Sequence, residues 1–89
     1  MSRYRECILN KLEETEEKAK KIDCWRSIVF FESPIEKQLE YRVIYAEHQL
    51  DAQQWAYDMH SKYYKLKIPY YVYSTASGSN YNGGLLIIE

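Results

Sequence analysis

The side chains that could support nucleophilic or metal chemistry are Cys7, Cys24, His48 and His60. A catalytic thiol needs a base and an orienting group within hydrogen-bonding reach, and neither cysteine has a histidine near it in the sequence. Zinc fingers place their paired ligands two to five residues apart, whereas 16 residues separate the cysteines and 11 separate the histidines. We therefore predict no catalytic residue, no metal and no cofactor, and we expect two small buried thiols.

A glycine-rich segment near the carboxyl end has the glycine spacing of a phosphate-binding loop. Gly78 and Gly83 match that spacing, but Gly84 and Leu85 stand where Lys and Ser or Thr belong. The segment also precedes a predicted strand, not a helix. Its turn-forming composition predicts a connecting loop over 77–84 and argues against nucleotide binding there.

Tyrosine is the unusual residue of this chain, with ten copies in 89 residues. Seven lie in the last third, interleaved with lysines: Tyr57, Tyr63, Tyr64, Tyr70, Tyr71, Tyr73 and Tyr81. Tyrosine offers a large contact area and keeps a polar tip, so it is enriched where proteins meet partners. Along a strand, Tyr71 and Tyr73 share one face and Tyr70 takes the other, so we expect one of these sets to lie in the core.

The formal net charge of −1 conceals two oppositely charged regions. Residues 32–58 contain six acidic and two basic side chains, whereas residues 59–88 contain three lysines and no acid. Two oppositely charged regions of this kind favour a partner surface with complementary charges. We expect a small non-enzymatic binding module that recognises a protein partner, and inhibits or regulates it, through a Tyr/Lys-rich C-terminal surface and the 77–84 loop. The predicted partner-binding residues are Lys62, Tyr64, Lys65, Lys67, Tyr70, Tyr71, Tyr73, Asn80, Tyr81 and Asn82.

The alternative function is weak binding of single-stranded nucleic acid, in which bases stack on tyrosines and lysines contact phosphates. Three lysines neutralise few phosphates, and the overall charge is slightly negative, so the balance favours a protein partner. Self-association as a homodimer is a further expectation, because a small chain gains stability by burying a leftover apolar face.

The length and composition fit one small domain over residues 1–89. No apolar run approaches the roughly 18 residues that span a bilayer, and the first six residues have no apolar segment like that of a signal peptide. Two cysteines are too few for a disulfide scaffold. We therefore expect a cytoplasmic protein without membrane contact.

The hydrophobic periodicity predicts the element order α-β-β-α-β-β. We expect a helix over 3–21 capped by Ser2, a strand over 24–32, a helix over 51–66 that begins at Asp51, and strands over 69–76 and 85–88. The apolar face of the second helix comprises Ala52, Trp55, Ala56, Met59, Tyr63 and Leu66. The strand over 24–32 is apolar at both parities, which predicts an inner strand covered on both faces. The predicted fold is α+β, with a mostly antiparallel four-stranded sheet and both helices on one face.

Residues 33–50 permit two interpretations. Ser33-Pro34-Ile35-Glu36 resembles a helix start, which would give one helix over 34–65. In the rival interpretation 33–38 is a turn and 39–46 is a strand, because apolar and polar residues alternate there with a period of two. A helix of about 32 residues is nearly three times the mean length, so we favour the strand.

In size and expected architecture, though in no particular motif, the chain is similar to short proteins of phages and mobile elements. Many of those proteins bind and block a single host protein. The resemblance implies an inhibitor that acts stoichiometrically by covering a surface of its partner.

Overall fold

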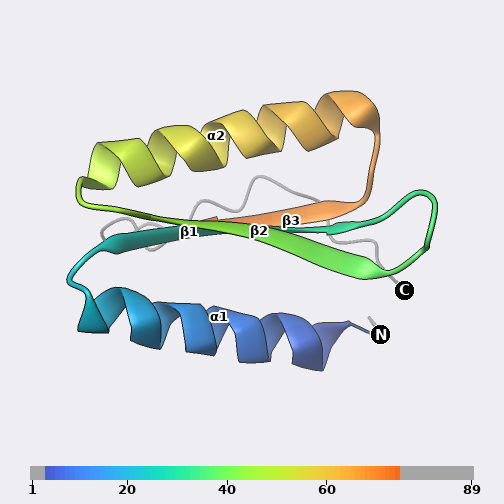
Figure 1. The fold of residues 1–89 in the computed structure, drawn as a ribbon. Helices are drawn as coiled ribbons and strands as arrows, with labels where there is room; N and C mark the ends of the chain where they lie inside the picture. The colour runs from blue at the N-terminus through green and yellow to red at the C-terminus, as the bar shows by residue number, and fades with distance from the viewer. Residues whose placement is uncertain (1–3, 75–89) are drawn as a thin grey trace.

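The structure, a computed structural model, describes residues 4–74 as two helices around a three-stranded antiparallel sheet (Figure 1). The elements are α1 (Arg5–Lys21), β1 (Trp25–Glu32), β2 (Leu39–Ala46), α2 (Gln49–Leu66) and β3 (Tyr70–Ser74). The α+β class is confirmed. The predicted loop over 77–84 and the predicted strand over 85–88 lie outside the described residues, so the fourth strand stays a prediction.

The central strand of the sheet is β1, with β2 and β3 as its two antiparallel neighbours. Because both neighbours run opposite to β1, β2 and β3 run in the same direction, and α2 connects them across one face. The predicted inner position of the first strand is confirmed, since six consecutive residues of β1, from Arg26 to Phe31, are buried.

The segment between β1 and β2 is a tight turn, although its sequence resembles a helix start. The Ser33 hydroxyl oxygen accepts a hydrogen bond from the Glu36 N–H at 3.3 Å, as a capping serine would. The Ser33 carbonyl then accepts from the Lys37 N–H at 2.8 Å. Lys37 adopts a left-handed conformation with φ 59°, which reverses the chain. The strand interpretation of 39–46 is therefore confirmed, and the helix over 34–65 is wrong.

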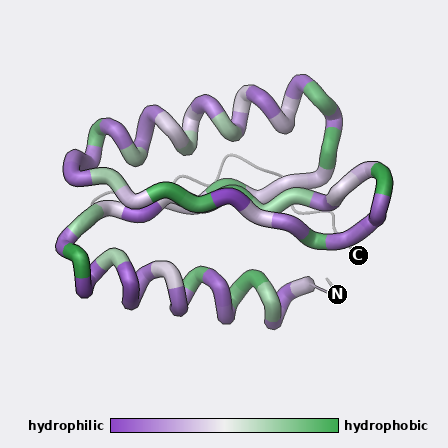
Figure 2. The backbone as a smooth tube through the Cα atoms, viewed as in Figure 1, coloured by the Kyte–Doolittle hydropathy of each residue, from purple (hydrophilic) through white to green (hydrophobic). Residues whose placement is uncertain are grey.

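The two helices lie on opposite faces of the sheet (Figures 1 and 2). Val29 and Phe31 of β1 pack in a core beneath α2, whereas Ile28 and Phe30 pack in a second core with Ile8 of α1. The prediction of both helices on one face is wrong. Successive side chains of a strand point to opposite faces, so a strand that is apolar at both parities needs a helix on each side.

Both helices begin at residues other than the predicted ones. The N-cap of α1 is Tyr4 rather than Ser2, and the N-cap of α2 is His48 rather than Asp51. Asp51 lies in the first turn of α2, where a negative charge is favoured by the helix dipole. The carboxyl end of α2 is set by Lys67, whose φ of 58° is left-handed and whose N–H donates to the Tyr64 carbonyl at 3.1 Å.

Candidate protein-interaction surface

The carboxyl-terminal end of α2 presents four of the predicted partner-binding residues to solvent. Lys62, Tyr64, Lys65 and Lys67 are all exposed. The Tyr64 side chain is 70% exposed, and its ring centroid lies 6.0 Å from that of His60. This end of the helix therefore combines positive charge with an accessible aromatic ring, as the sequence predicts.

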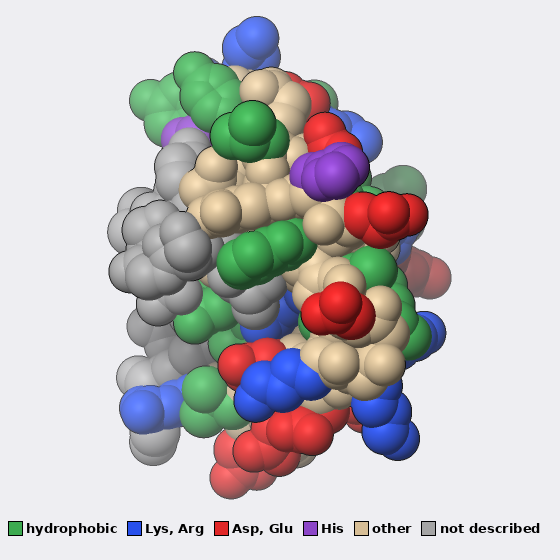
Figure 3. All heavy atoms as spheres, turned by 90° about the vertical axis from the view of Figure 1, so that its left-hand side faces the viewer, with side chains coloured by type: hydrophobic (Ala, Val, Ile, Leu, Met, Phe, Trp, Pro, Cys, Tyr) green, Lys and Arg blue, Asp and Glu red, His purple; other side chains and the backbone are tan. Residues whose placement is uncertain are grey.

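Two further exposed side chains extend this surface along α2. Leu50 is 76% exposed and Tyr57 is 54% exposed. Leu50, Tyr57 and Tyr64 are spaced seven residues apart, which is close to two helical turns, so they lie along one side of the helix. We call these three residues the α2 stripe. In Figure 3 hydrophobic side chains are exposed over α2 at the top, while charged side chains of both signs gather over α1 at the bottom.

Leu50 and Tyr57 were absent from the sequence-based set, although the seven-residue spacing of Leu50, Tyr57 and Tyr64 is visible in the sequence. Leu66 is a related correction, because it was assigned to the buried apolar face and is 55% exposed. Tyr63, one turn earlier, is buried and packs against the sheet. The chain turns away at Lys67, which leaves Leu66 beyond the packed part of the helix.

Tyr70 belongs to the core and not to the exposed surface, so its assignment as a contact residue is corrected. Its side chain is 5% exposed, and its hydroxyl lies 2.6 Å from His60 Nδ1. The neighbouring Tyr63 ring stacks on Phe31 with centroids 4.7 Å apart. Burial raises the pKa of the Tyr63 hydroxyl, as expected for a phenol whose charged form is poorly solvated.

Tyr71 and Tyr73 lie on the other face of the sheet, on the same side as α1, and both are half-buried. The Tyr71 ring lies 6.5 Å from Phe30 and 6.3 Å from Tyr73. The buried Arg26 guanidinium lies 5.2 Å from the Tyr73 ring centroid. Burial raises the pKa of Tyr71 and lowers that of Arg26. The predicted separation of Tyr70 from Tyr71 and Tyr73 by strand parity is confirmed.

The predicted contact residues therefore do not form one surface. Four share the exposed end of α2, Tyr70 is in the core, and Tyr71 and Tyr73 lie on the α1 side of the sheet. Asn80, Tyr81 and Asn82 lie outside the described residues. The sequence-based set therefore combined side chains that lie on opposite faces of the sheet.

The cysteines and histidines do not form a site within residues 4–74. Cys7 is exposed on α1, so its prediction as a buried thiol is wrong, and Cys24 is half-buried. His60 lies on α2, on the opposite side of the sheet from Cys7. Among the described residues no group of three or more His, Cys, Asp and Glu side chains is placed to hold a metal ion.

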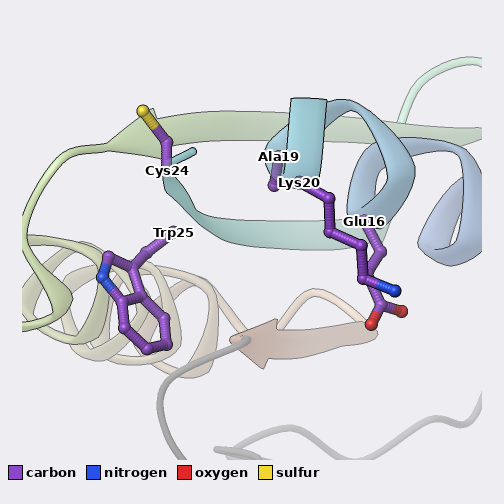
Figure 4. A pocket seen from close by; sticks show the side chains of 5 residues that line it. All are labelled: Glu16, Ala19, Lys20, Cys24 and Trp25. Atoms are coloured by element: carbon purple, nitrogen blue, oxygen red, sulfur yellow. The ribbon is translucent and has the colours of Figure 1, made fainter. Parts of the chain in front are cut away.

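A shallow hollow of about 170 Å³ lies where α1 ends and β1 begins (Figure 4). It is lined by Glu16, Ala19, Lys20, Cys24 and Trp25. In Figure 4 the Cys24 thiol points away from the Trp25 indole. Pockets for small molecules usually enclose about 300–1,000 Å³, so this hollow does not support a small-molecule site.

In the part of the chain that the structure describes, neither helix is long and apolar enough to cross a membrane. Comparison of the chain with protein-family models, with curated proteins and with solved structures finds no match.

Proposed function

We propose that this chain is a small non-enzymatic module that binds a protein partner through the outer surface of α2 and regulates or inhibits that partner. The contact surface comprises the α2 stripe (Leu50, Tyr57 and Tyr64) together with Lys62, Lys65, Leu66 and Lys67. The proposal rests on one observation: three large side chains seven residues apart, each more than half exposed, lie along a single helix.

Side chains of this kind gain free energy when a partner covers them, because apolar surface is then removed from water. A leucine side chain gains about 1.5–3 kcal/mol on full burial, and tyrosine side chains supply large contact areas at protein interfaces. A helix laid into a groove uses side chains at spacings of three, four and seven residues as anchors. Leu50, Tyr57 and Tyr64 have that spacing.

The charges around the stripe define the chemistry of the partner. Lys62, Lys65 and Lys67 all lie within three residues of Tyr64, near the carboxyl end of α2. A matching surface would offer an apolar groove for the tyrosines and acidic side chains near its end. Complementary charge of this type mainly accelerates association and selects the partner.

The test is affinity capture from a lysate of the source cells, followed by reconstitution with the purified partner. We expect a stoichiometric complex, and we expect the double variant Tyr57→Ala/Tyr64→Ala to bind at least roughly thirtyfold more weakly, because truncating one hot-spot tyrosine costs about 2 kcal/mol. Leu9→Ala is the matched control, because Leu9 is an exposed apolar side chain on α1, across the sheet. A complex that tolerates the tyrosine changes would overturn the proposal.

A second candidate function, weak binding of single-stranded nucleic acid, is favoured by the three exposed lysines beside Tyr64. Two measurements test this second function: nuclease treatment during affinity capture, and fluorescence anisotropy with a labelled oligothymidine. Nucleic-acid binding would weaken steeply between about 50 and 200 mM salt. We expect capture to survive nuclease and the oligothymidine to bind negligibly at physiological salt.

The proposal places the protein in the cytoplasm. Both cysteines are free, and Cys7 is exposed. Free exposed thiols are compatible with a reducing compartment. In its short length and its proposed regulatory role, this chain is similar to the small phage and mobile-element proteins that act by covering a host protein.

A further inference from the structure

The outer edge of β2 is unpaired within residues 4–74. The strand order is β2-β1-β3, so β2 borders the described sheet, and both helices lie over the faces and not over this edge. An edge strand carries a row of N–H and C=O groups that pair readily with another strand. The eight residues of β2 therefore offer a template for strand addition.

Two hydrogen bonds show which residues direct their backbone groups outward. The Gln38 carbonyl accepts from the Ser33 N–H at 2.8 Å, so Gln38 faces β1. Backbone groups alternate in direction along an antiparallel strand, so the odd-numbered residues of β2 face away from β1. The Arg42 guanidinium agrees with this assignment, because its exposed Nη1 donates to the Tyr41 carbonyl at 2.9 Å.

The charges of β2 are self-complementary about Tyr41. Glu40 and Arg42 lie on one face of the sheet, with Oε1 and Nη1 3.8 Å apart. When a second β2 strand pairs antiparallel with Tyr41 opposite Tyr41, Glu40 of each copy stands opposite Arg42 of the other. Sliding one strand by two residues either way brings two glutamates or two arginines together instead. Opposite charges stabilise a cross-strand pair, and like charges destabilise it, so one register is selected.

We propose that β2 pairs with β2 of a second copy of this chain, in the register centred on Tyr41, to form a twofold-symmetric dimer with a continuous sheet. The interface is isologous, as is usual for homodimers. On pairing, the Tyr41 carbonyl exchanges its bond with Arg42 for one with the Tyr41 N–H of the second copy. The pairing uses residues of β2 and none of the α2 stripe, so the inference is independent of the proposed function.

The test measures the oligomeric state of the full chain by sedimentation velocity and light scattering over increasing concentration. We expect a reversible dimer for the wild type. Glu40→Arg and Arg42→Glu each place like charges opposite each other in the homodimer and should weaken it roughly tenfold or more. The double variant Glu40→Arg/Arg42→Glu should restore it, and an equimolar mixture of the two single variants should form the heterodimer.

Circular dichroism of each variant establishes that the monomer is folded, and Glu17→Arg, an exposed charge reversal on α1, should leave the dimer intact. Tyr57→Ala/Tyr64→Ala should also stay dimeric, which separates this proposal from the α2 surface. A wild type that is monomeric at every concentration overturns the inference. Equally tight dimers of both single variants overturn it, and so does a mixture of folded single variants that does not associate.

Discussion

At the scale of single residues, one side-chain type occupies three kinds of environment. Tyr64 is exposed at the end of α2, Tyr71 is half-buried beside Arg26, and Tyr70 is buried with its hydroxyl against His60. Tyrosine tolerates all three because its ring is apolar and its tip is polar. Strand parity separated Tyr70 from Tyr71, but no local pattern could show which side of the sheet α1 would cover. That depends on long-range packing.

Three buried or half-buried tyrosines make stability sensitive to alkaline pH. Burial raises the pKa values of Tyr45, Tyr63 and Tyr71 above the ordinary 10.0. Above pH 10 the unfolded chain therefore loses phenolic protons before the folded chain does, so the free energy of unfolding falls as pH rises. Below pH 10 this contribution is fully present. We expect urea unfolding from about pH 8 to about pH 11 to show this decline, and Tyr63→Phe to make it shallower. A stability that stays constant above pH 10 would contradict this.

At the scale of elements, the end of α2 depends on a left-handed lysine. Lys67 has φ 58° and ψ 39°, a conformation that costs a non-glycine residue roughly 1–2 kcal/mol. We predict that Lys67→Gly raises the free energy of unfolding by about 0.5–1 kcal/mol, since glycine adopts this conformation without a Cβ clash. The matched control is Lys65→Gly, two residues earlier and inside the helix, which should lower stability by about 1 kcal/mol. Urea unfolding measures both, and a destabilised Lys67→Gly protein would refute the argument.

The sequence predicted the type and order of all five described elements. Its predictions were least accurate for features that depend on long-range packing. Alternation over 39–46 identified β2 correctly because every second residue from Leu39 is apolar, while Glu40 and Arg42 are polar. Ser33 makes the local bond of a helix cap, yet the left-handed Lys37 turns the chain back. Both helices were predicted on one face, although the apolar residues on both faces of β1 indicate that each face is covered. In the candidate surface, the three predicted lysines Lys62, Lys65 and Lys67 are exposed, whereas the exposure of Leu50 was not predicted.

At the scale of the whole molecule, the sheet separates two cores, and the α2 stripe lies outside both. Val29 and Val72 are buried beneath α2, and Ile28 and Phe30 are buried on the α1 side. Leu50, Tyr57 and Tyr64 of the α2 stripe belong to neither cluster. This arrangement predicts that contact residues and stability residues can be separated by mutation.

Comparison of tyrosine truncations tests that separation. Tyr70→Ala removes a buried ring and its hydrogen bond with His60, so it should lower the free energy of unfolding by about 3–5 kcal/mol. Tyr57→Ala and Tyr64→Ala remove exposed rings and should each change it by less than about 0.5 kcal/mol. Urea unfolding followed by the fluorescence of Trp25 and Trp55 measures all three. If the two exposed positions proved as costly as Tyr70, the α2 stripe would be part of the core, and the surface proposed to bind a partner would not exist.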